Sequence, residues 1–208
     1  MKLQSIREQI VDACHDLCRN NLMCNLGAGG NVSVRDPETG LVALTPSQVR
    51  YDTMTAEDIV VTDVNGTVIE ALDHRVPTSE LATHTMIYRE FSDIHAVVHA
   101  HAPFITAVTT VEDGLPALNY EQLYFISRVL PVIPFVMPGT DEMAEKVSAA
   151  LKQSSAIVIR NHGLFAIGGS LAETVVRAVV AEDAARLYVY ARSIGQPKLL
   201  PEDVKKPA

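Results

Sequence analysis

The stretch Ala96-Val97-Val98-His99-Ala100-His101 decides the fold, because it has the composition of a short buried strand that carries two histidines. Side chains alternate between the two faces of a strand, so His99 and His101 are expected on one face, with their α-carbons about 7 Å apart. That spacing suits two ligands of one cation. The alternative is a pair of core histidines that hydrogen-bond to their neighbours, and the rest of the chain bears on the choice.

Length and composition restrict the class of protein. The chain has 208 residues, 48% hydrophobic and 20% charged, which is the profile of a globular protein and excludes a disordered chain or a fibre. Its net charge of −8 argues against a nucleic-acid-binding protein. No apolar run approaches the roughly 20 residues that cross a bilayer, and the N-terminus lacks the apolar core of a signal peptide. We expect a cytoplasmic protein that binds neither nucleic acid nor membranes.

Three cysteines, Cys14, Cys18 and Cys24, lie close together near the N-terminus. A disulfide framework would spread an even number along the chain, so we interpret them as reduced thiols of a cytoplasmic protein. A zinc site is the alternative, but no pair of cysteines or histidines follows at the spacing of a zinc finger.

Hydrophobic periodicity predicts the elements around the histidine strand. Strands are expected over 32–35, 41–45, 59–62, 67–69, 96–101, 118–120, 132–136, 156–159 and 164–167. Helices are expected over about the first 20 residues, over 77–91 and 102–111, after Thr140, and from Ser170 to Gly195. Because hairpins dominate the early part, we expect one α/β domain over residues 1–208. It should have three layers, with a mixed, mainly antiparallel central sheet flanked by helices.

Two further residues favour a metal site over a pair of core histidines. His162 stands in Asn161-His162-Gly163, where a predicted buried strand breaks into a turn, and the glycine would let the backbone bend toward a metal. Glu80 falls in the first turn of the helix that Pro77 opens, where a carboxylate is either a partner of the helix dipole or a general base and ligand. Together these residues outline a three-histidine zinc site with a carboxylate beside it. A cupin-type site would need a glutamate shortly after the histidine pair, and the chain has none there.

Three segments have the composition of an anion site. They are Gly29-Gly30-Asn31, Thr45-Pro46-Ser47 and Thr78-Ser79, which offer backbone N–H groups, hydroxyls and a helix N-terminus. Each is weak alone, but Thr78-Ser79 directly precedes Glu80 and would place an anion beside the base. The other histidines, His15, His74, His84 and His95, have no such company and are interpreted as structural or solvated.

These motifs together resemble the class II aldolase/adducin family, and most closely its L-fuculose-1-phosphate aldolase branch. The resemblance covers roughly residues 5–195 and rests on five motifs in family order. They are Gly30-Asn31-Val32-Ser33-Val34-Arg35, Thr45-Pro46-Ser47, Pro77-Thr78-Ser79-Glu80, His99-Ala100-His101 and Asn161-His162-Gly163.

The resemblance implies a homotetramer with active sites at its subunit interfaces. Each subunit would bind one Zn²⁺, or another divalent metal such as Mn²⁺ or Co²⁺. The implied metal ligands are His99, His101, His162 and, without substrate, Glu80, which is also the proton donor and acceptor. The implied phosphate site consists of Gly30, Asn31, Ser47, Gln48, Thr78 and Ser79, and Tyr120 would assist at the aldehyde end.

The reaction implied is the reversible cleavage of a ketose 1-phosphate to dihydroxyacetone phosphate and an aldehyde. The substrate would be L-fuculose 1-phosphate or a 5-deoxy- or methylthio-pentulose 1-phosphate. The sequence departs from the fuculose branch at Gln48, where that branch has glycine, and at Thr78, where it has serine. The branch also uses a C-terminal tyrosine, whereas no tyrosine follows Tyr190.

Several relatives of different function stay open as alternatives. A decarboxylase, a dehydratase and a 4-epimerase would act on phosphorylated sugars or keto acids through the same zinc chemistry. The epimerases carry aspartate at the Glu80 position, which favours an aldolase. A non-catalytic adducin-like binding module would not need the three histidines and the glutamate that this chain retains.

Overall fold

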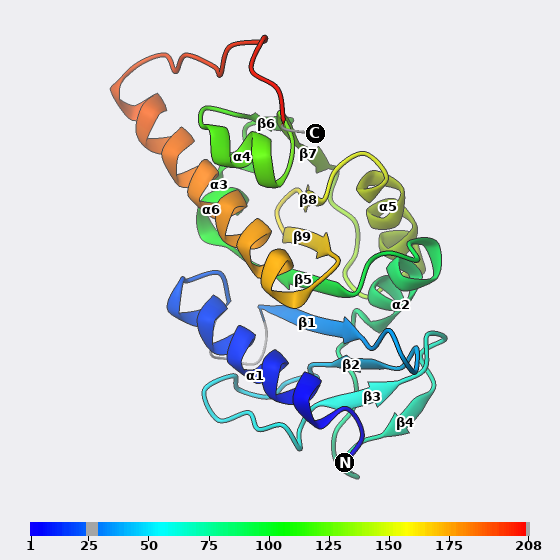
Figure 1. Ribbon diagram of the computed structural model, residues 1–208. Coiled ribbons are helices and arrows are strands. Elements are labelled where there is room, and N and C mark those ends of the chain that lie inside the picture. The colour runs from blue at the N-terminus through cyan, green and yellow to red at the C-terminus, as the bar shows by residue number, and fades with distance from the viewer. Residues whose placement is uncertain (24–28, 207–208) are drawn as a thin grey trace.

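Within residues 1–23 and 29–206, which the computed structural model describes, nine strands form one sheet (Figure 1) in the order β4-β3-β2-β1-β5-β9-β8-β7-β6. Cys24 and the 25–28 part of the glycine-rich segment lie outside the described residues. Neighbouring strands are antiparallel except β7 and β8, so the predicted mixed, mainly antiparallel sheet is confirmed. The strands are β1 (Gly30–Arg35), β2 (Val42–Leu44), β3 (Val60–Thr62), β4 (Val68–Glu70), β5 (Ala96–Ala100), β6 (Gly114–Pro116), β7 (Val129–Ile133), β8 (Ala156–Ile159) and β9 (Gly163–Gly168).

Helices cover both faces of the sheet, as expected for three layers. They are α1 (Gln4–Arg19), α2 (Leu81–Glu90), α3 (Pro103–Thr109), α4 (Tyr120–Phe125), α5 (Asp141–Leu151) and α6 (Leu171–Ile194). The long helix α6 crosses one face together with α1, α3 and α4, and α2 packs beside α5 on the other face (Figure 1). No helix in the described part of the chain is both long enough and apolar enough to cross a membrane.

The alternation of side chains along β5 places the histidine strand between two hydrophobic cores. Val98 belongs to the core under α1 and α6, and Val97 belongs to the core under α2 and α5. With a period of two residues, His99 faces the same side as Val97. The side chain of His99 therefore points toward the layer that contains α2.

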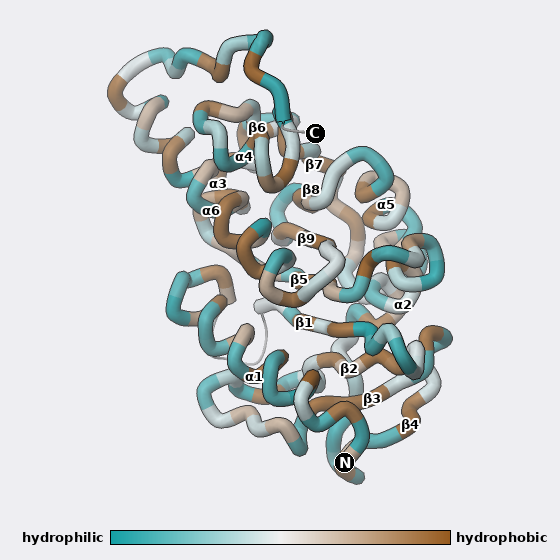
Figure 2. Tube along the Cα trace, viewed as in Figure 1, coloured by the Kyte–Doolittle hydropathy of each residue, from teal (hydrophilic) through white to brown (hydrophobic). Residues whose placement is uncertain are grey.

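The helix predicted over about the first 20 residues is confirmed as α1, and it is amphipathic. Ile10, Cys14 and Leu17 are fully buried in α1, whereas its remaining surface is hydrophilic, as the teal colour along most of this helix shows (Figure 2). Burial raises the pKa of the Cys14 thiol far above its usual value. Cys14 is a buried free cysteine.

Three predicted boundaries were wrong. The helix assigned to Pro77 begins at Leu81, because Pro77 instead forms a bridge with Pro46. The strand expected over 118–120 is absent from the described structure; Asn119 accepts the backbone N–H of Gln122 and so starts helix α4. The strand expected over 132–136 is β7 and ends at Ile133, and the following residue is a proline, which has no N–H for a sheet.

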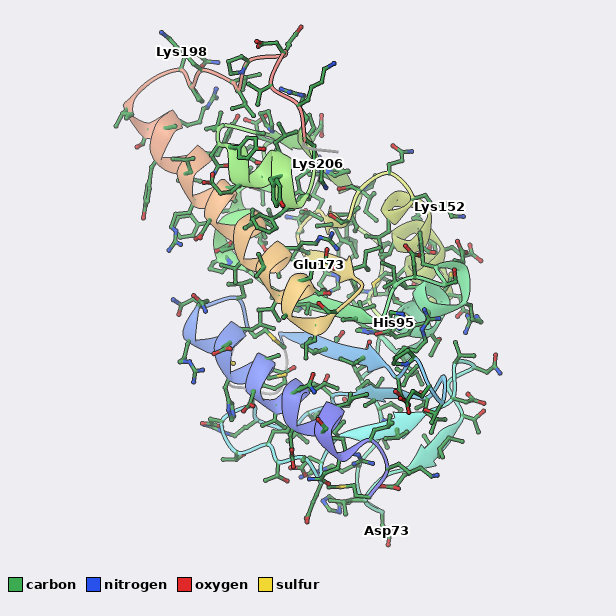
Figure 3. The ribbon with its side chains drawn as sticks, viewed as in Figure 1. Asp73, His95, Lys152, Glu173, Lys198 and Lys206 are labelled. Atoms are coloured by element: carbon green, nitrogen blue, oxygen red, sulfur yellow. The ribbon has the colours of Figure 1, made fainter. Side chains whose placement is uncertain are left out.

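The segment after α6 folds back over the end of the sheet, between Lys198 and Lys206 (Figure 3). The guanidinium of Arg128 donates to the carbonyl oxygens of Leu200, at 3.3 Å, and of Val204. The side chain of the residue just before β7 thus holds the C-terminal segment against the molecule.

Candidate active site

The imidazoles of His99, His101 and His162 converge on one point. Their ligand nitrogens lie within 4.8 Å of one another, and the Nε2 atoms of His99 and His101 are 3.0 Å apart. His99 is the last-but-one residue of β5, His101 follows the end of that strand, and His162 lies in the turn between β8 and β9. Strands β5 and β9 are neighbours, so the sheet brings together histidines about 60 residues apart in sequence.

His99 is held rigidly and in one tautomer. It is fully buried, it stacks on the ring of Phe165 at 4.2 Å, and its Nδ1 lies 2.9 Å from the carbonyl oxygen of Leu164. A carbonyl only accepts hydrogen bonds, so Nδ1 carries the hydrogen and Nε2 presents a lone pair to the centre of the cluster. A backbone carbonyl behind the imidazole is the usual support of a metal-ligating histidine.

The cluster keeps its imidazoles neutral. Burial is the main cause that lowers the pKa of His99 to about 3 and that of His162 to about 4, and each is lowered further by a neighbouring histidine. A histidine must be neutral to ligate a metal. The site is therefore ready to bind a cation at neutral pH without first losing protons.

The turn that carries His162 depends on two residues that flank it. Asn161 adopts a left-handed conformation with a φ of 58°, so the chain reverses at this asparagine and not at the glycine that sequence analysis singled out. Gly163 matters for a different reason: a Cβ there would lie 2.4 Å from the carbonyl oxygen of Ala100 and 3.1 Å from Cδ2 of His101. The lack of a side chain at Gly163 lets His162 approach His101.

Glu80 completes the cluster from helix α2. It is the N-cap residue of α2, but its side chain makes no capping hydrogen bond and is only 3% exposed. Its Oε2 lies 3.2 Å from Nε2 of His99, and its Oε1 lies 3.5 Å from Nε2 of His162. The carboxylate therefore points into the histidine cluster, which favours the role of base and ligand over that of a helix-dipole partner.

A pocket of about 360 Å³ opens over this cluster. Its described lining includes Glu80, His101, His162 and all six residues expected at the phosphate site: Gly30, Asn31, Ser47, Gln48, Thr78 and Ser79. No lysine or arginine stands among these described lining residues. An anion there would be bound by backbone N–H groups, amides, hydroxyls and the charge of a cation.

The backbone conformation at Gln48 bears on one departure from the family pattern, the glutamine that stands where the resemblance implies glycine. Its backbone is left-handed, with a φ of 58°, a conformation that glycine adopts most easily. The glycine of the fuculose branch thus suits this backbone, and glutamine occupies the same conformation with an exposed side chain.

Two tyrosines differ from the sequence prediction in their position relative to the pocket. Tyr120, the first residue of α4, is 43% exposed and does not line this pocket. Tyr51, which sequence analysis did not single out, does line it and donates its hydroxyl hydrogen to the carbonyl oxygen of Gly30. Tyr51 lies in a turn and belongs to no motif, so the sequence carried no signal for it.

His84 was set aside as structural or solvated, but it does contact the site. Its Nε2 hydrogen-bonds Oδ1 of Asn31, and the amide nitrogen of Asn31 donates to Oε2 of Glu80 at 2.8 Å. The sequence held a signal for this, because residues four apart lie on one side of a helix and His84 is four residues after Glu80.

The residues present fit a divalent cation. Three imidazoles with converging ring nitrogens form a donor set that catalytic zinc sites use, and a carboxylate lies beside them. His99 has its second nitrogen tied to a backbone carbonyl, and the cluster is accessible from the pocket. The arrangement can hold a metal and place a carboxylate beside whatever the metal binds.

Comparison with known proteins agrees with the geometry. The family model described as "Class II Aldolase and Adducin N-terminal domain" matches residues 8–189. The chain belongs to this family. It is 36% identical to the 5-deoxy-D-ribulose 1-phosphate aldolase of Bacillus thuringiensis serovar kurstaki, over 98% of this chain and 93% of that protein. It is 34% identical to the L-fuculose phosphate aldolase of Escherichia coli K12, over 95% and 88%.

A solved structure of an L-fuculose 1-phosphate aldolase superposes with a TM-score of 0.88 at 31% identity, covering 96% of this chain and 92% of that chain. These findings confirm the family and the fold that the motifs predicted. They also confirm the enzyme class at the level of the family, since the relatives are named aldolases, which are lyases.

Proposed function

We propose that the protein is a zinc-dependent aldolase that reversibly cleaves a ketose 1-phosphate to dihydroxyacetone phosphate and an aldehyde. One observation carries the proposal: a buried carboxylate, Glu80, lies within 3.5 Å of two histidines of a metal-type cluster. The expected anion-binding residues open onto the same pocket. The candidate substrates are L-fuculose 1-phosphate and a 5-deoxy- or methylthio-pentulose 1-phosphate, the classes that the names of the relatives support.

Four side chains would hold the metal: His99, His101, His162 and, in the absence of substrate, Glu80. We propose zinc, with Mn²⁺ or Co²⁺ as the other ions that this donor set accepts. The bound ion would act as a Lewis acid that stabilises the negative charge left on the substrate when the C3–C4 bond breaks.

The phosphate group would bind at the rim of the pocket. Asn31, Ser47 and Ser79 contribute an amide and two hydroxyls to the lining of the pocket. Because binding uses neutral donors, the negative net charge of the protein does not prevent the binding of a sugar phosphate. The phosphate then fixes the distance from C1 to the reacting carbons, which is how a remote group orients a reaction.

Glu80 would move the proton at C3. In its protonated form the side chain would deliver a proton to C3 after the bond breaks, and as a carboxylate it would remove that proton in the reverse direction. Burial of the side chain, at 3% exposure, keeps bulk water away from this proton. Tyr120 would move the proton of the C4 oxygen. Since Tyr120 lies outside the pocket of its own chain, this role requires a neighbouring subunit.

We further propose a cytoplasmic homotetramer with active sites at its subunit interfaces, built from one domain of residues 1–208. The exposed apolar side chains of Val129, Phe135 and Met137, which are 49%, 50% and 61% exposed, support such an assembly. Val129 begins β7, and Phe135 and Met137 follow that strand toward Pro138, which lines the pocket.

The test is a panel of ketose 1-phosphates, including L-fuculose, 5-deoxyribulose and 5-methylthioribulose 1-phosphates, with coupled detection of dihydroxyacetone phosphate. Cleavage of at least one member is expected. His101→Ala should abolish it, and His74→Ala, which changes an exposed histidine that does not line the pocket, should not. Failure on every member, with release of carbon dioxide from a keto-acid phosphate, would instead identify a decarboxylase.

A further inference from the structure

Behind the active site runs a chain of buried hydrogen bonds. From Oε2 of Glu80 it passes to the Asn31 amide, to both ring nitrogens of His84, to Oγ of Ser33 and to the Tyr88 hydroxyl. The Nδ1 of His84 lies 2.6 Å from Oγ of Ser33, which lies 2.8 Å from the Tyr88 hydroxyl. All five side chains are buried, with at most 6% exposed.

The chemistry of the first link fixes the direction of the others. An ionised carboxylate only accepts hydrogen bonds, so Asn31 must turn its NH₂ group toward Glu80 and its Oδ1 toward His84. An amide oxygen also only accepts, so His84 must carry its hydrogen on Nε2. Its Nδ1 is then a lone pair that accepts the hydroxyl hydrogen of Ser33. Every donor in the chain points toward the active site.

This one-way chain determines how the Asn31 amide is oriented. If His84 carried its hydrogen on Nδ1, two lone pairs would face each other between Nε2 and Oδ1, and the amide would be driven to rotate. A rotated amide would present its oxygen to the carboxylate of Glu80, which repels it. Ser33 fits the arrangement without rotation, because its hydroxyl donates to the lone pair on Nδ1 while it accepts from the Tyr88 hydroxyl.

We propose that His84 is a positioning residue of the reaction, which holds the Asn31 amide so that its N–H fixes Oε2 of Glu80. With Oε2 occupied as an acceptor, Oε1 is the oxygen that carries the proton to and from the substrate. The reaction itself is the one given under the proposed function, on which this role depends. The network explains why a buried core position between two layers holds a histidine, although an apolar residue would avoid the cost of desolvation.

The test compares two substitutions with different hydrogen-bonding capacity. His84→Leu removes the donor, and we expect kcat for exchange of the C3 proton of dihydroxyacetone phosphate to fall about 10–100-fold at unchanged metal content, the usual effect of losing an outer-shell partner. The KM should change much less than kcat. His84→Gln keeps an N–H at the reach of Nε2 and should recover most of the loss.

Thr83→Val is the matched control. Thr83 is buried on the same helix, and its hydroxyl has no hydrogen-bond partner within the described residues, so this variant should keep both stability and kcat. A His84→Leu enzyme that retains kcat within about twofold of wild type contradicts the proposal. So does an equal loss in the leucine and glutamine variants.

A second measurement needs neither activity nor a variant that folds. Long-range ¹H–¹⁵N spectra of the wild-type protein report which ring nitrogen of His84 carries the hydrogen. Hydrogen on Nε2 is expected, and hydrogen on Nδ1 would overturn the proposal. If the wild type exchanges no C3 proton at all, the proposed function has failed, and the spectrum still decides the arrangement of the network.

Discussion

Replacing Gly163 by alanine tests whether the close approach of two strand ends sets the geometry of the histidine cluster. The added Cβ would lie 2.4 Å from the carbonyl oxygen of Ala100, whereas ordinary contacts begin at 3.4 Å. The turn and the end of β5 would have to separate by about 1 Å to restore an ordinary contact. Because these two segments carry His162 and His101, the separation would act directly on two of the three imidazoles.

The size of the effect follows from what a metal tolerates. Metal–nitrogen distances in zinc sites are about 2.0–2.1 Å and vary by only about 0.2 Å, so a shift of about 1 Å removes one good ligand or strains all three. We expect the metal affinity to fall at least about 10–100-fold. Overpacking should also lower the free energy of unfolding of the metal-free protein by about 1–3 kcal/mol.

Competition with a chromophoric chelator measures the metal affinity, and urea unfolding of the metal-free protein measures the stability. The matched control is Val147→Ala, which removes buried methyl groups on α5 and should cost about 1–3 kcal/mol with no effect on metal affinity. Unchanged metal affinity in Gly163→Ala would refute the argument, because the close approach would then not govern the cluster.

Three further predictions concern stability. Burial lowers the pKa of both His84 and His99 from 6.5 to about 3, so below about pH 6.5 the unfolded chain binds protons that the folded chain does not. The free energy of unfolding of the metal-free protein should therefore fall as the pH drops from about 6.5 toward 3, by up to about 1.4 kcal/mol per pH unit for each of the two histidines. Urea unfolding at several pH values measures this dependence, and a flat profile would contradict the prediction. The carboxylate of Glu182 accepts the first two backbone N–H groups of α3, and the N-cap residue of that helix offers no side-chain cap. Glu182→Ala should therefore lower the free energy of unfolding by about 2–4 kcal/mol in chemical denaturation. Glu182→Gln should keep part of this stability. The buried guanidinium of Arg7 pairs with Glu70 and also donates to backbone carbonyls. Arg7→Met should therefore lower the free energy of unfolding by about 2–4 kcal/mol without altering metal binding. A loss below about 0.5 kcal/mol in urea unfolding would be incompatible with that role.

The sequence predicted the parts of the site that short motifs encode. His99 and His101 are two residues apart on an apolar strand, so they had to share a face. Glu80 stands at a predicted helix start, so its carboxylate had to lie near an end of that helix. These are local consequences of strand and helix geometry. The break of a predicted buried strand at Asn161-His162-Gly163 added the expectation that the distant His162 joins them, and the pairing of β5 with β9 accounts for how it does.

What the sequence could not predict depends on tertiary contacts. Helix α4 was missed because its start relies on the side chain of Asn119, while Tyr120 and the apolar residues around it resemble a strand. The importance of Gly163 comes from the carbonyl of a different strand, and that of His84 comes from an amide on β1. None of these partners is close in sequence.

The most direct test of the proposed chemistry is exchange of the C3 proton of dihydroxyacetone phosphate with deuterated water, measured by mass spectrometry on wild type and Glu80→Gln. This half-reaction needs no aldehyde, so it does not depend on the identity of the sugar. The wild type should incorporate one deuterium at C3. Glu80→Gln should bind metal but exchange about 10²–10⁴-fold more slowly, the usual contribution of a general base. Equal exchange in the two proteins, or none in a metal-loaded wild type, would contradict the account.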